Sequence, residues 1–251
     1  MPLYFIGLGL NNEKDISING LEAIKKCDLI YLENYTSVLN CKKEDLEKFY
    51  NKKIIFARRN LVEDDDNEII ENAKSKNVAF LVAGDPLAAT THIDLFLRAK
   101  KEGIKSHVIH NASITSAVGV TGLQVYKFGK TTSIPLQNEN IEAPYDVLKD
   151  NLGLGLHTLF LLDLDTEEGK FMSVNDAIRC LLKIEIKKNE RVFSEKTLCI
   201  GCARLGSEKQ VIKAGAAKEL LKFDFGKPVH CLIVPGKLHF MEEEGLKLWL
   251  T

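Results

Sequence analysis

The residues best suited to chemistry in this sequence follow an unbroken apolar run at positions 78–82. Gly84, Asp85 and Pro86 end that run, and small residues that include Ala88 come next. Glycine lets the backbone approach a ligand closely, the Asp85 carboxylate can accept hydrogen bonds or bind a cation, and proline fixes φ. We interpret this stretch as a ligand-binding turn, although an ordinary tight turn has the same composition.

Other residue patterns that often carry chemistry are incomplete in this chain. Cys199 and Cys202 form a single Cys-x-x-Cys inside a run typical of an interior strand, and no second pair follows at zinc-finger spacing. His92, His107, His110, His157 and His239 lack the helical spacing of metal ligands, so we interpret them as structural or surface residues. The sequence therefore predicts no metal site.

The first apolar run ends in two glycines, Gly7 and Gly9, which is typical of a strand that leads into a ligand loop. A dinucleotide fingerprint would need a third glycine at position 12, where the chain has Asn12, and an immediate helix. A helix is predicted only from about Ser17. The pattern therefore disfavours NAD binding.

Strands and helices alternate around these loops in the first half of the chain. Strands are predicted at 3–10, 29–33, 53–57, 78–82 and 106–110, with helices near 17–25, 46–49, 67–76 and 92–101. Such alternation predicts a mostly parallel sheet covered on both faces. The polar loop at 34–37 would then lie at the same edge as the Gly-Asp-Pro turn, while the acidic run at 63–66 is predicted to be a solvated loop.

The segment 111–119 consists of small residues, is polar at its start and ends in Gly119, and we interpret it as a domain junction with a short helix. Ser173 and Asp176 have the spacing of a capping box, which predicts that a helix begins there. Further elements are expected as strands at 131–134, 158–162, 197–203, 210–214 and 229–234, and as helices at 144–149, 216–221 and after 239.

Composition limits the class of protein. The 34 basic residues are balanced by 35 acidic ones, so there is no overall basic field to hold a nucleic acid. No apolar run approaches the roughly 20 residues of a membrane span, and the start has no features of an export signal. We expect a soluble cytoplasmic protein with free thiols and neither nucleic-acid nor membrane partners.

The sequence resembles the diphthine synthase family in a set of segments that occur in order over nearly the whole chain. They are LYFIGLGL at 3–10, LENYTSVL at 32–39, GDPLAATTH at 84–92, VIHNASI at 108–114, GVTGLQVYKFG at 119–129, GLHTLFLLD at 155–163, MSVNDA at 172–177, ARLGS at 203–207 and HCLIVPGKLH at 230–239. Glycine loops alone would be weak evidence, whereas this ordered set is specific.

The resemblance implies an α/β fold of the tetrapyrrole methylase type with two αβα domains. The first, 1–110, is expected to have a mostly parallel sheet, and the second, 111–251, a mixed one. S-adenosyl-methionine would bind in the cleft between them without a metal, and the protein would be a homodimer. Similarity also implies which residues contact the cofactor: Leu10, Asp85, Ala88, Ser113, Ile114, Leu162, Leu205 and His230. At position 205 the neighbours Ala203 and Arg204 are alternatives.

The implied reaction belongs to diphthamide biosynthesis and transfers methyl groups from S-adenosyl-methionine to the amino group of a modified histidine on translation elongation factor 2, leaving S-adenosyl-homocysteine. An amine attacks a sulfonium methyl in line, so alignment and water exclusion are the main requirements and no covalent intermediate is needed. The sequence names no general base, since a carboxylate, a backbone oxygen or water could each accept the proton.

Two alternatives are a methyltransferase of the same fold that acts on a tetrapyrrole precursor, and a module that binds S-adenosyl-methionine without catalysis. The Asn-Ala-Ser-Ile and Tyr-Lys-Phe-Gly motifs resemble the diphthine branch, and the cofactor loops are intact. The archaeal type of the family trimethylates, whereas the eukaryotic type goes on to a methyl ester. The short connection 163–172 favours the archaeal type.

Overall fold

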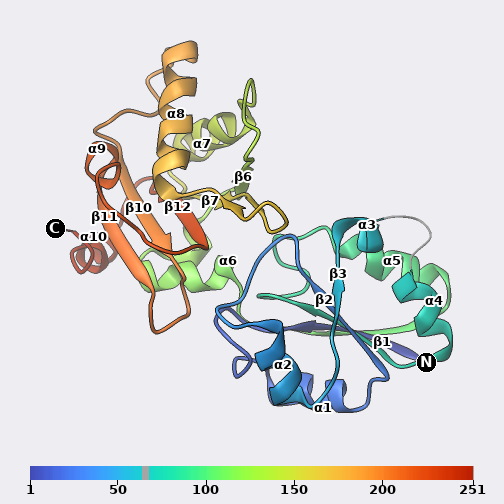
Figure 1. Cartoon of the computed structure of the whole chain (residues 1–251). Helices are drawn as coiled ribbons and strands as arrows, with labels where there is room; N and C mark the ends of the chain where they lie inside the picture. Colours follow the sequence, from blue (N-terminus) through green and yellow to red (C-terminus); the bar gives the residue numbers. More distant parts are fainter. Residues whose placement is uncertain (64–67, 251) are drawn as a thin grey trace. The chain divides into compact units, whose positions relative to one another are not determined.

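The computed structural model describes residues 1–63 and 68–250, which form two compact units, Met1–Thr115 (unit 1) and Ser116–Thr251 (unit 2) (Figure 1). The division falls close to the boundary predicted after residue 110. Asn111 packs with unit 1, because its side-chain amide donates hydrogen bonds to the carbonyl oxygens of Gly7 and Asp15, both at 3.0 Å. Most of the predicted acidic loop at 63–66 lies outside the described residues.

The sheet of unit 1 is parallel throughout, as predicted. Its order is β3-β2-β4-β1-β5. The strands are β1 (Pro2–Gly7), β2 (Leu29–Glu33), β3 (Ile55–Ala57), β4 (Val78–Val82) and β5 (Lys105–Ile109). Because the strands are parallel, the loops that follow them all start from one edge of the sheet.

Helices cover both faces of this sheet. The fully buried strand β4 shows why, since its side chains alternate between two apolar cores. Val78, Phe80 and Val82 belong to the core that also includes residues of α3 (Arg59–Glu63), α4 (Glu68–Ser75) and α5 (Ile93–Lys101). Ala79 and Leu81 belong to the other, with α1 (Ile18–Lys25) and α2 (Lys43–Tyr50). Helix α3 was not predicted, because five residues are too few to show a helical period.

The sheet of unit 2 is mixed, with the order β11-β10-β12-β7-β6. Only the β6–β7 pair is parallel, and the other three pairs are antiparallel. Its strands are β6 (Thr132–Ile134), β7 (Thr158–Leu162), β10 (Leu198–Ala203), β11 (Val211–Ala216) and β12 (His230–Val234). A small antiparallel pair, β8 (Leu164–Asp165) with β9 (Lys170–Phe171), had not been predicted.

The main core of unit 2 lies between this sheet and α7 (Ala143–Gly153), α8 (Val174–Lys188) and α9 (Ala217–Leu220). Helix α8 begins at the predicted capping box, where the Ser173 hydroxyl accepts a hydrogen bond from the Asp176 amide at 3.1 Å. The remaining helical segments are α6 (Ile114–Ala117), which crosses the unit boundary, the 3₁₀ turns η1 (Val118–Thr121) and η2 (Val125–Lys127), and α10 (Phe240–Leu246).

The Cys-x-x-Cys lies in the interior strand β10, as predicted. Cys199 and Cys202 are both fully buried. Residues three apart in a strand point to opposite faces, so the two thiols cannot share one metal ion. Cys202 lies opposite Cys231 of β12. These cysteines are therefore core residues.

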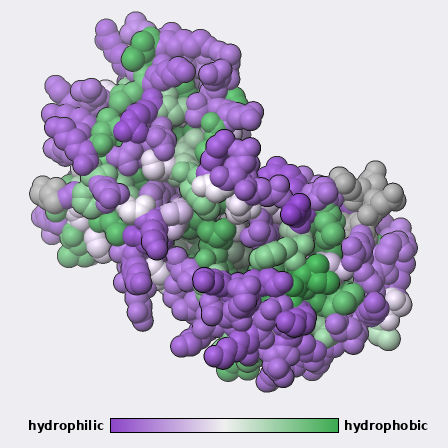
Figure 2. Space-filling view, in the orientation of Figure 1, coloured by the Kyte–Doolittle hydropathy of each residue, from purple (hydrophilic) through white to green (hydrophobic). Residues whose placement is uncertain are grey.

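The visible surface of each unit is mostly hydrophilic with hydrophobic areas between (Figure 2). On unit 1 the exposed apolar side chains include Ile55 and Phe56 of the edge strand β3. Within residues 1–63 and 68–250, every helix is too short or too polar to cross a lipid bilayer.

Candidate functional site

The loops after β1 and β4 are joined through two glycines. The amide of Gly84 donates to the carbonyl of Gly9 at 2.7 Å, and the reverse bond is 3.2 Å long. Both residues have positive φ, 76° and 80°, which glycine adopts without strain. A Cβ on Gly7 would lie 2.6 Å from the Gly84 carbonyl oxygen and 2.8 Å from the Asn111 side chain. Glycines thus bring the backbones of these two loops into direct contact.

Asp85 ties the β4 loop to the loop after β5. Its Oδ1 accepts a hydrogen bond from the Leu87 amide at 3.0 Å, and its Oδ2 accepts from His110 Nδ1 at 2.8 Å and from the Asn111 amide at 3.1 Å. Burial alone would raise the pKa of Asp85, but these bonds outweigh it and lower the pKa. A carboxylate has about four acceptor positions, so one position on Oδ1 is left for a ligand.

The loop after β1 has its own carboxylate. Asp15 Oδ2 accepts from the amides of Leu10 and Asn11 at 3.2 and 2.8 Å. The side-chain amide of Asn111 also donates a hydrogen bond to the backbone carbonyl oxygen of Asp15. These bonds fix the backbone at Leu10, a predicted cofactor residue whose side chain is half-buried.

The five cofactor residues predicted in unit 1 follow three neighbouring strands, β4, β1 and β5. They therefore lie at one edge of the sheet. Ala88, Leu10 and Ile114 are half-buried, whereas Asp85 and Ser113 are 8% and 6% exposed. The Ser113 hydroxyl is 2.6 Å from that of Thr115. This edge offers apolar surface, backbone groups and a few polar atoms, the usual mixture in a small-molecule site.

The three cofactor residues predicted in unit 2 also gather at one end of a sheet. Leu162 is the last residue of β7 and His230 the first of β12, and the register pairs Leu161 with Cys231. Ala203, the last residue of β10, lies opposite His230 on its other side. Leu205 follows two residues later and is 5% exposed.

His230 and Arg204 have different roles at this end. Arg204 donates to the carbonyl oxygens of Lys209 at 3.0 Å, Phe225 at 3.1 Å and Lys227, so its guanidinium holds the surrounding loops. His230 Nε2 donates to the Lys227 carbonyl at 3.0 Å, while Nδ1 is buried and has no hydrogen-bond partner within the described chain. Burial lowers the pKa of His230, which leaves Nδ1 as a neutral acceptor.

A second buried carboxylate lies at the opposite end of β12. Glu242 and His157 are both fully buried, and Glu242 Oε1 accepts from His157 Nε2 and from the Gln124 amide, each at 2.9 Å. Its Oε2 accepts from the His239 amide at 2.8 Å and from Lys127 Nζ. Burial alone would raise the pKa of Glu242, but these donors lower it to about 2.

The histidines separate into two groups. His92 and His157 are buried, His107 stacks on Tyr4, and His239 caps α10, which agrees with structural roles. His110 differs, since its ring is 70% exposed and bonds to Asp85. Sequence reasoning missed this role, and the only signal was the position of His110 directly before Asn111 in the VIHNASI segment.

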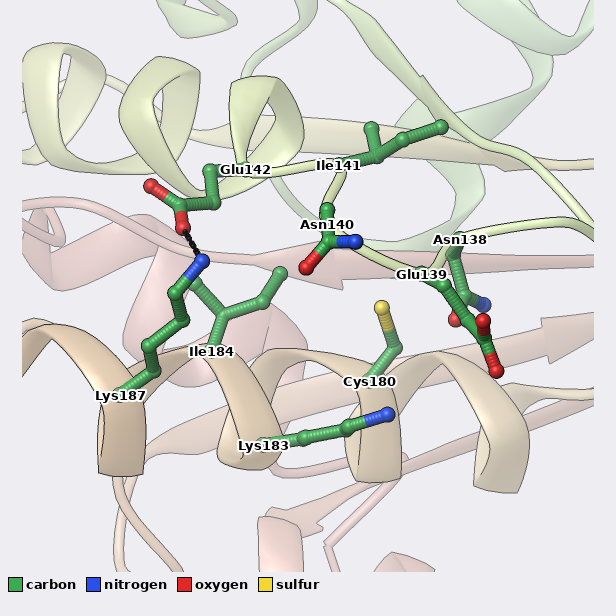
Figure 3. Close-up of a pocket in the computed structure, with 9 residues that line it drawn as sticks. All are labelled: Asn138, Glu139, Asn140, Ile141, Glu142, Cys180, Lys183, Ile184 and Lys187. Atoms are coloured by element: carbon green, nitrogen blue, oxygen red, sulfur yellow. Dashed lines mark hydrogen bonds and ion pairs between the residues drawn. The ribbon is translucent and has the colours of Figure 1, made fainter.

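A cavity of about 290 Å³ in unit 2 contains none of the predicted residues (Figure 3). It lies between the loop 138–142 and α8, and the ion pair between Glu142 and Lys187, 2.5 Å long, closes one side. Its volume is at the lower bound of the roughly 300 to 1,000 Å³ of ligand pockets. Cys180 and Ile184 supply an apolar floor, but no reactive group stands out.

In each unit, the predicted cofactor residues lie at a strand end that offers backbone groups, apolar surface and a few polar atoms, as small-molecule sites do. Gly7 allows the β1 loop to pack against Gly84 and Asn111, and His230 Nδ1 is an unpaired acceptor in the described structure. Across residues 1–63 and 68–250, no group of three or more His, Cys, Asp or Glu side chains is arranged to hold a metal ion.

Comparison with known proteins separates the family from others that share loops of this kind. Residues 2–221 match the family model of tetrapyrrole (corrin/porphyrin) methylases. A diphthine synthase of Methanosarcina mazei is 53% identical, with 97% of this chain and 94% of that protein covered. The chain belongs to the diphthine synthase family. It is accordingly a methyltransferase of the S-adenosyl-methionine-dependent type.

Other members of the diphthine synthase family agree in both sequence and fold. A protein of Arabidopsis thaliana named "Probable diphthine methyl ester synthase" is 47% identical, with 98% of each chain covered. A crystal structure of diphthine synthase matches with a TM-score of 0.92 at 39% identity, covering 100% of this chain and 96% of the other. The expected fold class, with a parallel first sheet and a mixed second sheet, is confirmed.

Proposed function

We propose that this chain methylates the amino group of the modified histidine of translation elongation factor 2, as a step of diphthamide biosynthesis. The observation that carries the proposal is full-length similarity to diphthine synthases, together with intact glycine loops at the carboxyl edge of the first sheet. When bound, S-adenosyl-methionine supplies a sulfonium methyl group that a neutral amine can attack in line. S-adenosyl-homocysteine is the expected product.

The chain's own residues would bind and orient the reactants. In unit 1 the backbone around Gly84, with Leu10, Ala88 and Ile114, would enclose the cofactor, and the free position on Asp85 Oδ1 would accept a hydrogen bond from it. In unit 2, Leu162, Leu205 and His230 would contribute, with His230 Nδ1 as the acceptor. We also propose that the protein acts as a cytoplasmic homodimer.

The acceptor is expected to carry a carboxylate as well as an amino group. A methyl ester is formed on a carboxylate, and the Arabidopsis thaliana relative is named for that product. We propose that this chain stops at the amine and adds three methyl groups, because the connection that contains β8 and β9 is short. Mass spectrometry of the product gives the number of methyl groups directly.

Calorimetry tests the cofactor assignment. S-adenosyl-methionine or S-adenosyl-homocysteine should bind at one site per chain, and NAD should not bind. Methyl transfer should also persist in the presence of EDTA, because in-line transfer from a sulfonium needs no Lewis acid. Tight binding of NAD without binding of S-adenosyl-methionine would contradict the proposal, as would loss of activity with EDTA and its recovery with one divalent ion.

A further inference from the structure

The carboxyl edge of the sheet in unit 1 has a second half that the predicted cofactor residues do not use. Those residues follow β4, β1 and β5, whereas β2 and β3 end in Glu33 and Ala57 at the other side of β4. Tyr35 and Arg59 come directly after these two strands. His92 joins them from the β4 loop, with its ring 6.1 Å from that of Tyr35. We call Glu33, Tyr35, Arg59 and His92 the Tyr35 cluster.

Glu33 fixes the loop that carries Tyr35. Its side chain is 2% exposed, and Oε1 accepts from the amides of Tyr35 and Thr36 at 2.6 and 2.5 Å. Oε2 accepts from the Thr36 hydroxyl at 3.0 Å. A single buried carboxylate thereby holds the backbone of the loop after β2, which carries Tyr35.

Arg59 stacks on this ring. Its guanidinium carbon is 5.2 Å from the Tyr35 ring centroid, and the residue is exposed at the start of α3. Among the described residues, the acids nearby are Glu33 and Glu63. Glu33 accepts hydrogen bonds from its own loop, and Glu63 accepts one from the Thr91 hydroxyl at 3.2 Å. Arg59 forms no ion pair within the described part of the chain. A stacked guanidinium keeps its N–H edge available for a planar acceptor such as a carboxylate.

Within the Tyr35 cluster, His92 makes the connection to the Gly-Asp-Pro loop. The residue is 1% exposed, its Nδ1 donates to the Pro86 carbonyl at 3.2 Å, and burial lowers its pKa to about 4. Its Nε2 is therefore a neutral acceptor. Among the described residues neither this nitrogen nor the Tyr35 hydroxyl has a hydrogen-bond partner, and both atoms are buried. They are complementary as acceptor and donor.

We propose that Arg59 binds the carboxylate of the methyl acceptor and that Tyr35 and His92 position its guanidinium. This inference rests on the proposed function, which supplies an acceptor with both an amino group and a carboxylate. Arginine and carboxylate form paired hydrogen bonds of fixed geometry, which would orient the neighbouring amine. The β4 loop contains Asp85 and Ala88 as well as His92, so one loop of unit 1 serves both reactants.

The test compares Arg59→Ala and Arg59→Lys with the wild type, using elongation factor 2 that carries the modified histidine. We expect kcat/KM for this acceptor to fall about tenfold to 150-fold in Arg59→Ala, the effect of one charge-assisted hydrogen bond. The affinity for S-adenosyl-methionine should not change. Arg59→Lys should recover only part of the loss, because an ammonium group does not form the paired bonds.

Arg179→Ala is the matched control, since Arg179 is a similarly exposed arginine on α8 whose ion pair with Asp176 lies on the surface. It should leave kcat/KM unchanged. A second measurement uses the acceptor with its carboxylate converted to an amide. With this acceptor, kcat/KM of the wild type should fall by the same factor as in Arg59→Ala. The kcat/KM of Arg59→Ala should fall little further, because the two changes remove one interaction.

The assignment of Arg59 would be overturned if the losses in kcat/KM from Arg59→Ala and from the amide acceptor multiplied. An unchanged kcat/KM in Arg59→Ala would overturn it as well. Tyr35→Leu tests the positioning role, and it should raise KM for the acceptor without adding to the effect of Arg59→Ala. Additive effects in the double variant would remove Tyr35 from the proposal. A wild-type protein that binds S-adenosyl-methionine but methylates no form of elongation factor 2 would instead contradict the proposed function.

Discussion

Asp85 in unit 1 and Glu242 in unit 2 are both buried carboxylates that accept hydrogen bonds from a histidine and from backbone amides. Glu242 also accepts from Lys127, its histidine is fully buried, and the second nitrogen of His157 accepts from the Gly236 amide at 3.0 Å. Asp85 keeps one acceptor position, and its histidine is 70% exposed. A carboxylate whose partners are all internal stabilises the fold, whereas one with a free position and an exposed partner can also bind a ligand.

The same contrast separates the two ends of the sheet in unit 2. His157 lies beside the first residue of β7, and both of its nitrogens are used. His230 lies at the other end of that sheet and has one nitrogen without a partner in the described structure. The cofactor residues predicted for unit 2 cluster at the end that has this unpaired acceptor. We propose that the fully paired His157 is a structural residue and that the unpaired nitrogen of His230 serves binding.

Glu242→Gln should have the largest effect on stability. The amide would place a donor against Lys127 and against backbone amides in a buried site, and breaking such a pair costs about 3 to 5 kcal/mol. Thermal unfolding monitored by circular dichroism measures the change, with Glu243→Gln on the exposed side of α10 as the control. A loss no greater than that of the control would show that the buried network contributes little.

At acid pH, the wild type and Glu242→Gln should differ less in their free energy of unfolding. The pKa of Glu242 is lowered from 4.5 to about 2, so its contribution is fully present above pH 4.5 and is lost as the pH falls through the folded value. Unfolding free energies measured from pH 7 down to about 2.5 should therefore converge for the two proteins. Curves that stay parallel over this range would show that Glu242 does not titrate as the contacts imply.

Asp85→Asn should affect stability and binding together. The amide would oppose at least one of three donors, which costs about 1 to 3 kcal/mol, and would weaken the remaining acceptor position. The affinity for S-adenosyl-methionine should fall about tenfold to 150-fold. Calorimetry and melting on the same variant separate the two roles. A lower melting temperature with unchanged affinity would leave Asp85 as a purely structural residue.

His110→Ala should have the smallest effect of these variants. The ring is mostly exposed, so water can replace part of its hydrogen bond to Asp85. Asp85 would still accept from the amides of Leu87 and Asn111. We expect a small change in melting temperature and a measurable change in cofactor affinity. If the stability loss matched that of Glu242→Gln, the two carboxylates would not differ in the way described here.

Local sequence patterns predicted much of this structure because they reflect local physics. The run 78–82 became the fully buried β4, and Ser17 and Ser173 cap helices that were predicted to begin near these two residues. The edge location of Asp85 followed from parallel strands. Helix α3 and the β8–β9 pair were missed, because elements of five and two residues carry no periodic pattern.

Contacts between distant residues could not be predicted in this way. Glu242 meets Gln124 and His157 across 118 and 85 positions of the chain, and no local pattern records such a partner. The same holds for Arg59, whose exposure and charge are ordinary until the Tyr35 ring beneath it is known. For the same reason the sequence alone gave His110 a structural or surface role without its bond to Asp85.

The most direct test of the account is methyl transfer to elongation factor 2 followed by mass spectrometry of the modified histidine. The wild-type protein with S-adenosyl-methionine should add three methyl groups to the amine of the modified residue and none to an unmodified histidine. Asp85→Asn should slow this reaction through weaker cofactor binding, whereas Glu243→Gln should not. An acceptor that stays unmethylated under conditions where calorimetry shows bound S-adenosyl-methionine would contradict the assignment.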